Sequence, residues 1–555
     1  MGKAAKIGVG LACALSALAT VTSPAAAPKK QPELLPVAPD ALTHALEHGR
    51  LSEAQYALER ARSLFRLEAV RSRFGEVARP GPHDATLVLR DLAVRLGDLS
   101  PSERRAARGL LSRPDDTTYT DEHHYPVGAT VLTACDSASR FCIHWIEGAP
   151  DAPDPTDDDS NGLPDQVDAT AAVLDQSWTT EFDTLGYREP LSDADSPGQA
   201  GSPGLDVYLA ELGPDGIFGY TWSDDPDIAN ADVGGPWDIS AYLVLDNDYS
   251  EFCSSTCSPA IAMGLLQVTT AHELKHTSHF AYDWAEDSWL LESDATATED
   301  VVFDSVNDNR RYLPASPLKR PGVSIDNGAP NAEYQYGAWI FMRYLSERFG
   351  PGVLSTIWDR ADGSAGGPDD YSLQAVVNAV NASGSSLTLA FTTFGRWNRT
   401  PARFYEEGSA YPSTPTAKTW TLGPSTPTSG WGLRRLDHMT NAYYRFQPGP
   451  NVKTTASLNV SVDLPYTYAK PAATALVFYK SGAYSVRAIG LNSGGDGSRL
   501  VPFGRGTVKY VDLVLTNASA RFNLSTCWGG YTYYSCGGAV PYDDRRIYRF
   551  RADLR

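Results

Sequence analysis

The chain contains the stretch Ala-His-Glu-Leu-Lys-His-Thr-Ser-His-Phe at residues 271–280. The pattern predicts a helix, on which His272 and His276 are four residues apart and share one face. Two imidazoles at this spacing can bind one Zn²⁺ at ~2.0–2.1 Å. Glu273 lies beside them, where it can take a proton from water that the ion holds and acidifies toward a pKa of ~7. The alternative is a surface helix that carries two histidines.

A third ligand has to come from another part of the chain. His279 cannot complete the set, because at ~1.5 Å rise per residue it lies ~10 Å along the helix from His272. We expect it to line the cleft or to pack. Residues 287–300 read Asp-Ser-Trp-Leu-Leu-Glu-Ser-Asp-Ala-Thr-Ala-Thr-Glu-Asp, which predicts a second helix capped by Asp287. If the chain turns between the helices, they run antiparallel and Glu292 meets the two imidazoles as the predicted third zinc ligand.

The second helix offers one more carboxylate on the same face. Glu299 follows Glu292 by seven residues, which is two helical turns. Ligand histidines usually donate their other ring N–H to a carboxylate or a carbonyl, and Glu299 is the predicted acceptor. The alternative is an ordinary solvated carboxylate.

These two motifs together resemble those of the gluzincin zinc metallopeptidases. His-Glu-x-x-His is followed by Trp289-x-x-Glu292-x-x-Ala295, and in that family the third ligand is a Glu on the next helix. The resemblance is closer to the aminopeptidase-like branch than to thermolysin, since Leu291 stands where thermolysin has Asn. The metzincin pattern fails, because its Gly and third His positions hold His279 and Tyr282. The resemblance implies a zincin-like metallopeptidase domain with Glu273 as the general base.

The same resemblance implies a tyrosine that stabilises the oxyanion. The family takes it from a Tyr-x-x-Gly stretch that opens a later helix, and this chain has Tyr334-Gln-Tyr336-Gly337. The match selects Tyr334, with Tyr336 as the second choice; core or groove aromatics are the alternative. The sequence has no counterpart of the Gly-x-Met-Glu-Asn motif of aminopeptidases, which favours an endopeptidase acting on protein or peptide substrates. The resemblance covers roughly residues 100–400 and extends to a group of secreted bacterial metalloproteases.

An acidic loop upstream predicts a calcium site. Residues 157–168 read Asp-Asp-Asp-Ser-Asn-Gly-Leu-Pro-Asp-Gln-Val-Asp and match the 12-residue calcium loop, with Gly162 at the sharp turn. Clustered carboxylates repel one another without a cation, which favours calcium over an acidic surface turn. The last position holds Asp where Glu is usual. The predicted ligands are Asp157, Asp159, Asn161, the carbonyl of Leu163, Asp165 and Asp168.

The N-terminus has the layout of a secretory signal peptide. Lys3 and Lys6 precede an apolar run at residues 7–21, and Ala25 to Ala27 offer a cleavage site. A membrane anchor is the alternative, but the run is shorter than the ~20 residues that a spanning helix needs. We expect removal of residues 1–27, a secreted extracellular protein and no later membrane span.

Cysteine usage agrees with export. Of seven cysteines, Cys13 falls in the predicted signal peptide. The other six could pair in fifteen ways, but proximity favours three local disulfides in an oxidising compartment. The predicted pairs are Cys135 with Cys142, Cys253 with Cys257, and Cys527 with Cys536.

The chain has 555 residues, which exceeds the ~250–300 residues that one core supports. We predict an α+β fold with several parts. Its net charge of -20 argues against nucleic-acid binding. The predicted parts are a signal peptide at 1–27, a helical region at 28–115, a metallopeptidase domain at 116–408, a Pro/Ser/Thr-rich linker at 409–430 and a β-sandwich at 431–555. The helical region is either a pro-region over the active site or a layer of the enzyme domain.

Three functions remain open at this stage. The first is a zinc endopeptidase. The second is a zinc hydrolase that acts on a non-peptide ester or amide with the same chemistry. The third is a catalytically inactive, calcium-binding surface protein, against which the intact Glu273 argues.

Overall fold

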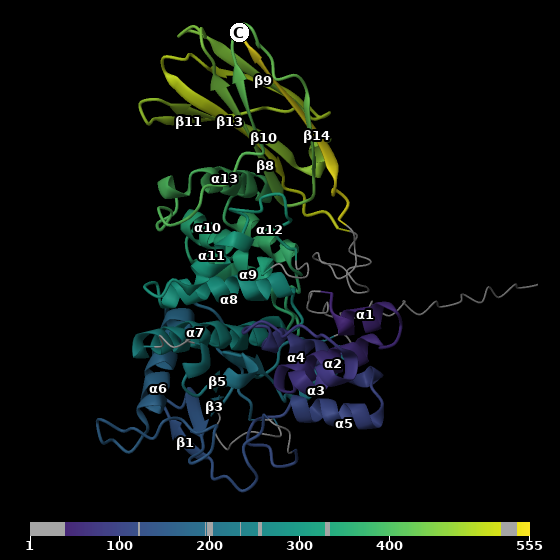
Figure 1. Cartoon of the computed structure of the whole chain (residues 1–555), viewed down its shortest axis with the longest axis vertical. Coiled ribbons are helices and arrows are strands. Elements are labelled where there is room, and N and C mark those ends of the chain that lie inside the picture. The colour runs from purple at the N-terminus through teal and green to yellow at the C-terminus, as the bar shows by residue number, and fades with distance from the viewer. Residues whose placement is uncertain are drawn as a thin grey trace, which may run out of the picture.

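The computed structural model of the chain describes residues 39–119, 123–194, 196, 204–232, 235–252, 258–327, 333–522 and 541–555. Helices and three sheets are combined in it, which confirms the α+β class. A β-sandwich lies at one end of the long axis, helices form the middle, and a mixed sheet with a side cluster of N-terminal helices forms the other end (Figure 1). The predicted signal peptide lies outside the described residues.

The N-terminal helices pack beside the mixed sheet (Figure 1). Glu103 and Ser100 form a reciprocal capping box that fixes the start of the last one, with Pro in its first turn. Residues 75–84 connect the third and fourth helices. The helices are α1 (Ala41–Glu47), α2 (Glu53–Phe65), α3 (Leu67–Phe74), α4 (Ala85–Ala93) and α5 (Pro101–Leu110).

The mixed sheet has the strand order β1-β2-β3-β5-β4. Its three central strands are parallel, and they are buried along their whole length, as is usual for parallel strands covered on both faces. β4 is the last strand of the order and pairs antiparallel with β5. The strands are β1 (Leu132–Cys135), β2 (Phe141–Trp145), β3 (Leu205–Ala210), β4 (Gly219–Trp222) and β5 (Tyr242–Asp246).

Helices cover this sheet and continue toward the sandwich (Figure 1). The two predicted metal-site helices are α7 and α8, joined by a turn at residues 284–287. Most of α7 is buried on all sides, which is typical of a central helix. The helices are α6 (Asp165–Trp178), α7 (Pro259–Asp283), α8 (Ser288–Val302), α9 (Tyr334–Gly337), α10 (Trp339–Phe349), α11 (Gly352–Ala361), α12 (Leu373–Ala382) and α13 (Leu387–Arg399).

Two sheets of mostly antiparallel strands form the C-terminal β-sandwich. Their strand orders are β11-β10-β13-β8-β6 and β12-β9-β14-β7. Along β9, buried residues alternate with partly exposed ones, so one face of that strand points into the apolar core. The strands are β6 (Lys418–Leu422), β7 (Gly432–Leu436), β8 (Thr440–Pro448), β9 (Ser457–Asp463), β10 (Pro471–Tyr479), β11 (Tyr484–Ala488), β12 (Asp496–Pro502), β13 (Val508–Asn517) and β14 (Arg546–Leu554).

The stretch at 409–430, which we expected to be a linker, carries the first strand of this sandwich. β6 pairs in parallel with β8, from Lys418 opposite Tyr444 to Leu422 opposite Pro448. The alternating Thr-Trp-Thr-Leu within it suits a strand and outweighs the Pro and Ser residues on either side. The sandwich therefore begins before residue 431.

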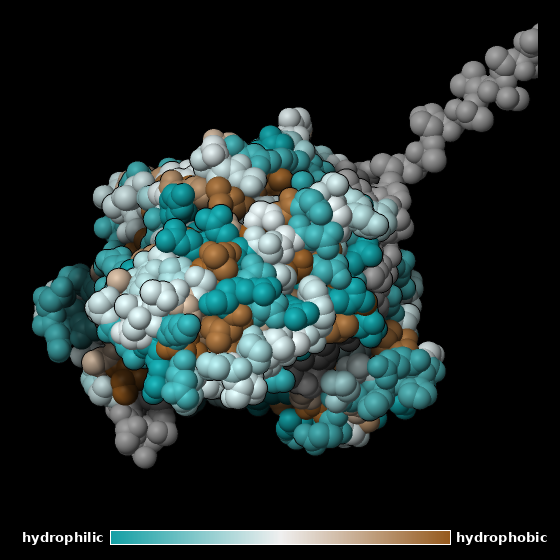
Figure 2. Space-filling model, turned by 90° about the horizontal axis from the view of Figure 1, so that it is seen from above, coloured by the Kyte–Doolittle hydropathy of each residue, from teal (hydrophilic) through white to brown (hydrophobic). Residues whose placement is uncertain are grey.

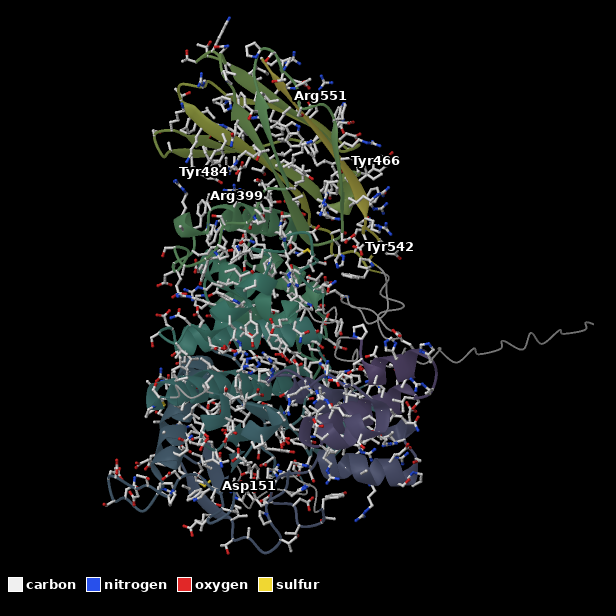
Figure 3. All side chains as sticks on the ribbon, in the orientation of Figure 1. Asp151, Arg399, Tyr466, Tyr484, Tyr542 and Arg551 are labelled. Atoms are coloured by element: carbon white, nitrogen blue, oxygen red, sulfur yellow. A yellow bond between two sulfur atoms is a disulfide. The ribbon has the colours of Figure 1, made fainter. Side chains whose placement is uncertain are left out.

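Ion pairs join α13 to the sandwich. Arg399, labelled in Figure 3, donates from Nε to Asp512 of β13 at 2.8 Å. Arg445 of β8 binds the same carboxylate. Seen from the sandwich end, the surface is mostly hydrophilic, with hydrophobic residues scattered among polar ones (Figure 2). Within the described residues, no helix combines the length and apolar character that a bilayer span requires.

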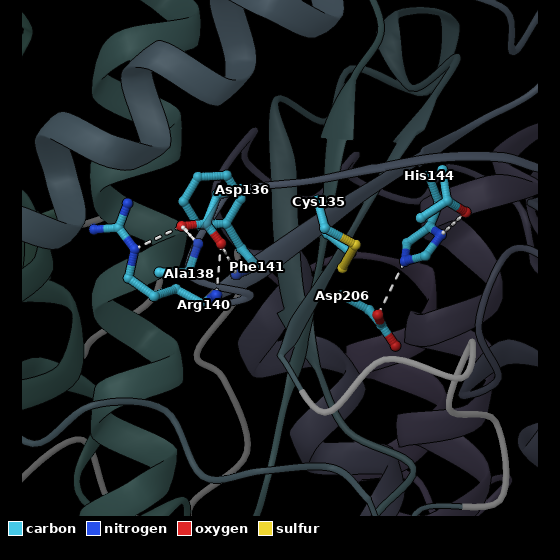
Figure 4. Close-up of a disulfide and its surroundings, with 9 residues drawn as sticks. Cys135, Asp136, Ala138, Arg140, Phe141, His144 and Asp206 are labelled. Atoms are coloured by element: carbon cyan, nitrogen blue, oxygen red, sulfur yellow. Dashed lines mark hydrogen bonds and ion pairs between the residues drawn. A yellow bond between two sulfur atoms is a disulfide. The ribbon is translucent and has the colours of Figure 1, made fainter.

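The disulfide between Cys135 and Cys142 is present and closes the β1–β2 hairpin (Figure 4). The two residues are direct partners across the antiparallel pair, with a Cα–Cα distance of 4.0 Å. This predicted pair is confirmed. The other four predicted disulfide cysteines, Cys253, Cys257, Cys527 and Cys536, lie outside the described residues.

Candidate active site

α7 and α8 bring two imidazoles and one carboxylate together. One donor atom from each of His272, His276 and Glu292 lies within 4.8 Å of the others, and all three residues are fully buried. His272 contacts Glu299, late in α8, whereas His276 faces Glu292 a little earlier, so the helices run in opposite directions. The short turn at 284–287 produces this antiparallel pairing.

The donor set fits a small divalent cation. The distance from His272 Nε2 to Glu292 Oε2 is 3.2 Å, and that from His276 Nε2 to Glu292 Oε1 is 3.7 Å. Two atoms bound to one tetrahedral zinc at ~2.0–2.1 Å lie roughly 3.3–3.4 Å apart. His276 Nε2 and Glu292 Oε1 are buried and lack a hydrogen-bond partner. Buried polar atoms are rarely left unpaired, and these two atoms could serve as ligands of a cation.

Outer partners hold both imidazoles in place. Glu299 Oε1 lies 2.7 Å from His272 Nδ1, as predicted for an acceptor behind a ligand. His279 lies behind His276, and the Nδ1 atoms of the two rings are 3.2 Å apart. The other ring nitrogen of His279, Nε2, lies 3.2 Å from Asp294 Oδ2. His279 also stacks on Trp358, with ring centroids 4.0 Å apart, so it packs and does not join the donor set.

The electrostatics of the site favour positive charge. Burial lowers the pKa of His272, but Glu292 and Glu299 outweigh burial and raise this pKa well above its usual value. Burial raises the pKa of Glu292, yet the two imidazoles hold it at about 2. Burial also raises the pKa of Glu299, to about 7, against the hydrogen bond from His272. The cluster therefore attracts a cation, either protons or a metal ion.

Glu273 is fixed through one oxygen and free at the other. Thr221 of β4 donates to Glu273 Oε2 at 3.0 Å and to its backbone carbonyl at 2.7 Å. Thr86 donates to the same Oε2 at 3.1 Å. Oε1 is buried without a hydrogen-bond partner, and it lies 4.0 Å from His83 Nδ1. The carboxylate thus keeps one oxygen available as a proton acceptor.

The tyrosine nearest the imidazoles is Tyr336, not Tyr334. The Tyr336 ring centroid lies 6.3 Å from that of His272, whereas the Tyr334 hydroxyl donates to the carbonyl of Val323 at 2.9 Å. The two side chains are two residues apart in the short helix α9 and point in different directions. This geometry favours Tyr336, the second choice made from the motif, and the catalytic role of either tyrosine stays a prediction.

Three residues of the N-terminal region join the site, and none was predicted from the sequence. His83 stands over His272 with ring centroids 4.6 Å apart, and Asp84 accepts a hydrogen bond from the Tyr336 hydroxyl at 2.7 Å. Thr86 binds Glu273, as described above. These residues are about 190 positions before the motif helix, and no spacing rule links them to it. The only signal in the sequence is a His between Pro-Gly-Pro and the start of a helix.

The acidic loop folds into a closed turn of the expected shape. Gly162 has a φ of +93°, and Asp157 and Asp159 both accept from the backbone N–H of Asn161, at 3.1 and 3.0 Å. Asp168 accepts from the Asn161 side chain at 2.9 Å. The loop is mostly exposed, and its polar atoms are satisfied by one another. Calcium binding at these residues therefore stays a prediction.

Comparison with known proteins finds matches among solved structures but none by sequence. Neither a protein-family model nor a curated protein matches the sequence. Among solved structures, Legionella pneumophila aminopeptidase A in complex with aspartic acid has 12% sequence identity and a TM-score of 0.31, covering 71% of this chain and 36% of that chain. A family GH115 4-O-methyl-alpha-glucuronidase, BtGH115A, has 9% identity and a TM-score of 0.13, covering 67% and 54%. The chain spans about a third of the length of the aminopeptidase.

Proposed function

We propose that the chain is a secreted zinc-dependent peptidase. His272, His276 and Glu292 would hold the ion, and Glu273 would act as the general base. The observation that carries the proposal is the buried donor set with unpaired atoms beside a carboxylate that also has one unpaired oxygen. The predicted signal peptide supports secretion.

Zinc bound here would polarise a carbonyl group and acidify a water molecule. The residues of the chain supply the remaining functions. Thr221 holds Glu273 Oε2, so Oε1 is the oxygen that accepts a proton and passes it to the leaving amine. The Tyr336 ring centroid lies 6.3 Å from that of His272, and the Tyr336 hydroxyl would donate to the oxyanion once Asp84 releases it.

The edge strand favours a peptide as the substrate. β4 pairs with β5 on one side and carries Thr221, which binds the general base. An extended peptide can add to a free sheet edge through main-chain hydrogen bonds. A peptide bound along β4 would pass beside Glu273, which supports an endopeptidase over a hydrolase of small esters.

The proposal also includes a calcium ion at residues 157–168. The turn at Gly162 and the oxygens around Asn161 support it. The loop runs into α6, whose first turn contains Asp165 and Asp168. Because α6 packs against α7, an ion there would stabilise the support of the metal-site helix.

The test measures zinc content and hydrolysis of casein, before and after limited trypsin digestion, because the N-terminal region covers the site. We expect one zinc per chain, activity that a chelator removes, and a loss of about 10²–10⁴-fold in Glu273→Gln with zinc retained. Glu47→Gln, an exposed carboxylate of α1, is the matched control. Absence of zinc from the purified chain, or full activity of Glu273→Gln, would contradict the proposal.

A further inference from the structure

Charge is divided unevenly along this chain. Residues 418–555 contain 17 Lys and Arg against 7 Asp and no Glu, which gives this part a net charge of +10. The whole chain carries -20, so the part before residue 418 carries -30. Such an asymmetry is a sign that one part of a chain binds an anionic partner. The basic part is the C-terminal β-sandwich.

The outer face of the second sheet of the sandwich, in which β7 pairs with β14, carries exposed arginines. Arg435 of β7 and Arg549 of β14 are both exposed. Arg549 pairs across the strands with Leu433, two residues before Arg435, so the two arginines share one face. Phe550, next to Arg549, points into the apolar core instead. The arginine face is therefore the one that meets solvent.

Three exposed tyrosines form a cluster near the start of β14. Tyr466, Tyr468 and Tyr542 have relative exposures of 60%, 56% and 51%. The rings of Tyr466 and Tyr468 are stacked, with centroids 5.8 Å apart. The guanidinium carbon of Arg521 lies 4.9 Å from the ring centroid of Tyr468 and 5.6 Å from that of Tyr542, so it joins the rings. Tyr466 and Tyr542 lie on the β14 side of the sandwich (Figure 3).

The tyrosines and the arginines form one continuous surface. Arg521 donates to the buried carboxylate of Asp543 at 3.3 Å, directly after Tyr542 in the chain. Two residues farther on, the carbonyl of Arg545 accepts from Arg435 at 3.3 Å. We name this region the Tyr–Arg surface, and its exposed residues are Tyr466, Tyr468, Arg521, Tyr542, Arg435 and Arg549.

The side chains of the Tyr–Arg surface select the chemistry of the ligand. A phenol ring offers a broad apolar face, on which the apolar face of a sugar ring can stack. A guanidinium group binds a carboxylate through paired hydrogen bonds. An acidic polysaccharide supplies both partners in every repeat, because each sugar ring carries a carboxylate.

Carboxylates beside the arginines favour a sugar chain over a polymer of phosphates. Arg549 pairs with Asp463 and Arg551 pairs with Asp553, each at 2.9 Å, and these side chains are partly exposed. The two carboxylates can accept hydrogen bonds from sugar hydroxyl groups. A nucleic-acid strand or a phospholipid surface would place phosphates beside them, and like charges repel.

We propose that the Tyr–Arg surface binds an acidic polysaccharide, with the sugar rings on the tyrosines and the carboxylates at the arginines. This binding surface goes beyond the proposed peptidase activity and does not depend on it. The sandwich, at +10, is attracted to the polymer, whereas the rest of the chain, at -30, is repelled. Because the sandwich lies at one end of the long axis, the polymer holds the chain by that end (Figure 1).

The first experiment measures binding of the intact, unmutated chain to soluble polygalacturonate by isothermal titration calorimetry. Fully methyl-esterified polygalacturonate keeps the rings without the charge, and poly-L-glutamate keeps the carboxylates without the rings. We expect polygalacturonate to bind at least tenfold tighter than either control polymer. The binding should disappear in ~1 M NaCl, where the screening length falls to ~3 Å. No binding to polygalacturonate, or equal affinity for a control polymer, would overturn the proposal.

Two other anionic partners are tested under the same conditions. Single-stranded DNA and vesicles of phosphatidylserine with phosphatidylcholine should bind at least tenfold more weakly than polygalacturonate. If either binds as tightly as polygalacturonate, the surface recognises phosphates and the proposal fails. None of these measurements needs a variant, and none depends on whether the chain binds zinc or hydrolyses casein.

The second experiment tests the tyrosines in the full chain. Tyr466→Ala combined with Tyr468→Ala should weaken polygalacturonate binding about tenfold, because the stacking faces are lost. Tyr466→Phe combined with Tyr468→Phe keeps the rings and should bind as the unmutated chain does. Thermal unfolding checks that each variant is folded. Unchanged binding in the Ala variant would contradict the role of the tyrosines.

A matched pair of variants tests the arginines. Arg435→Gln combined with Arg549→Gln should weaken polygalacturonate binding about tenfold or more, since each loses a charged hydrogen-bond donor. Lys480→Gln combined with Arg487→Gln removes the same charge from exposed side chains at the β10–β11 hairpin and is the control. The control should bind nearly as the unmutated chain does. Equal losses in both pairs would mean that net charge alone acts, and the Tyr–Arg surface would not be the binding site.

Discussion

Two buried histidine–carboxylate clusters in this chain resemble each other in composition but differ in how their atoms are paired. In the metal cluster, formed by His272, His276, Glu292 and Glu299, His276 Nε2 and Glu292 Oε1 have no hydrogen-bond partner. The second, which we name the junction cluster, consists of Asp326, His438 and Asp544. There, His438 Nδ1 lies 2.6 Å from Asp544 and Nε2 lies 2.9 Å from Asp326.

The difference separates a candidate metal site from a cluster whose polar atoms are satisfied by ion pairs alone. Both ring nitrogens of His438 have a carboxylate partner, so a protonated imidazole satisfies the junction cluster between the helical part and the sandwich. The metal cluster has two imidazoles converging on one carboxylate, and protons alone leave donor and acceptor atoms unpaired. The unpaired atoms, and not the residue types, are the reason to propose a cation at the first cluster and none at the second.

The largest expected effect comes from Glu292→Ala. Loss of a direct ligand should weaken zinc binding by more than the ~10–100-fold that loss of an outer partner costs. Competition with a chromophoric chelator measures the affinity. Asp326→Ala, the matched change in the junction cluster, should destabilise the chain but leave zinc affinity unchanged. Equal zinc affinity in both variants would remove the distinction between the clusters.

The second prediction concerns pH and the junction cluster. Burial lowers the pKa of His438, but Asp326 and Asp544 outweigh burial and raise it from 6.5 to about 9. The native state therefore holds a proton that the unfolded state releases between these values. The proton on His438 stabilises the native state by about 3 kcal/mol at most. This stabilisation is fully present below pH 6.5 and is lost as the pH rises through 9. Urea unfolding between pH 6 and 10 should show the free energies of unfolding of wild type and His438→Gln converging as the pH rises. A constant difference between the two free energies would contradict the prediction.

A smaller effect is expected for Glu299→Gln. Its carboxylate accepts from His272 Nδ1 at 2.7 Å, and the amide would weaken that orientation without removing a ligand. Zinc affinity should fall ~10–100-fold while the stoichiometry stays at one. Glu68→Gln, an exposed carboxylate of α3, serves as the control and should bind zinc as the wild type does. No change in Glu299→Gln would mean that Glu299 does not support the metal.

The smallest effect is expected at the acidic loop, whose atoms are already satisfied by one another. Calcium at ten times its dissociation constant should stabilise the chain by about 1.4 kcal/mol, and Asp168→Asn should abolish the gain. Thermal unfolding with calcium or a chelator measures it, with the exposed Asp98→Asn as the control. An identical response of the two variants to calcium would exclude a site at residues 157–168.

Much of the metal cluster follows from the sequence alone. Helical spacing sets His272 and His276 on one face, and a short turn before a second helix brings Glu292 opposite them, because local geometry fixes both arrangements. The α+β class and the Cys135–Cys142 disulfide are likewise local consequences of pattern and proximity. The strand at 418–422 was missed because Pro and Ser on either side hid a short β pattern.

Only the tertiary structure selected Tyr336 over Tyr334 and placed His83 over His272. Two tyrosines in one helical turn point to different surroundings, and the direction depends on how α9 packs. The contact with His83 joins residues about 190 positions apart, so it depends on the docking of a whole helical region. Sequence spacing determines contacts within a helix or across a tight turn, whereas contacts between distant segments form only when the chain packs.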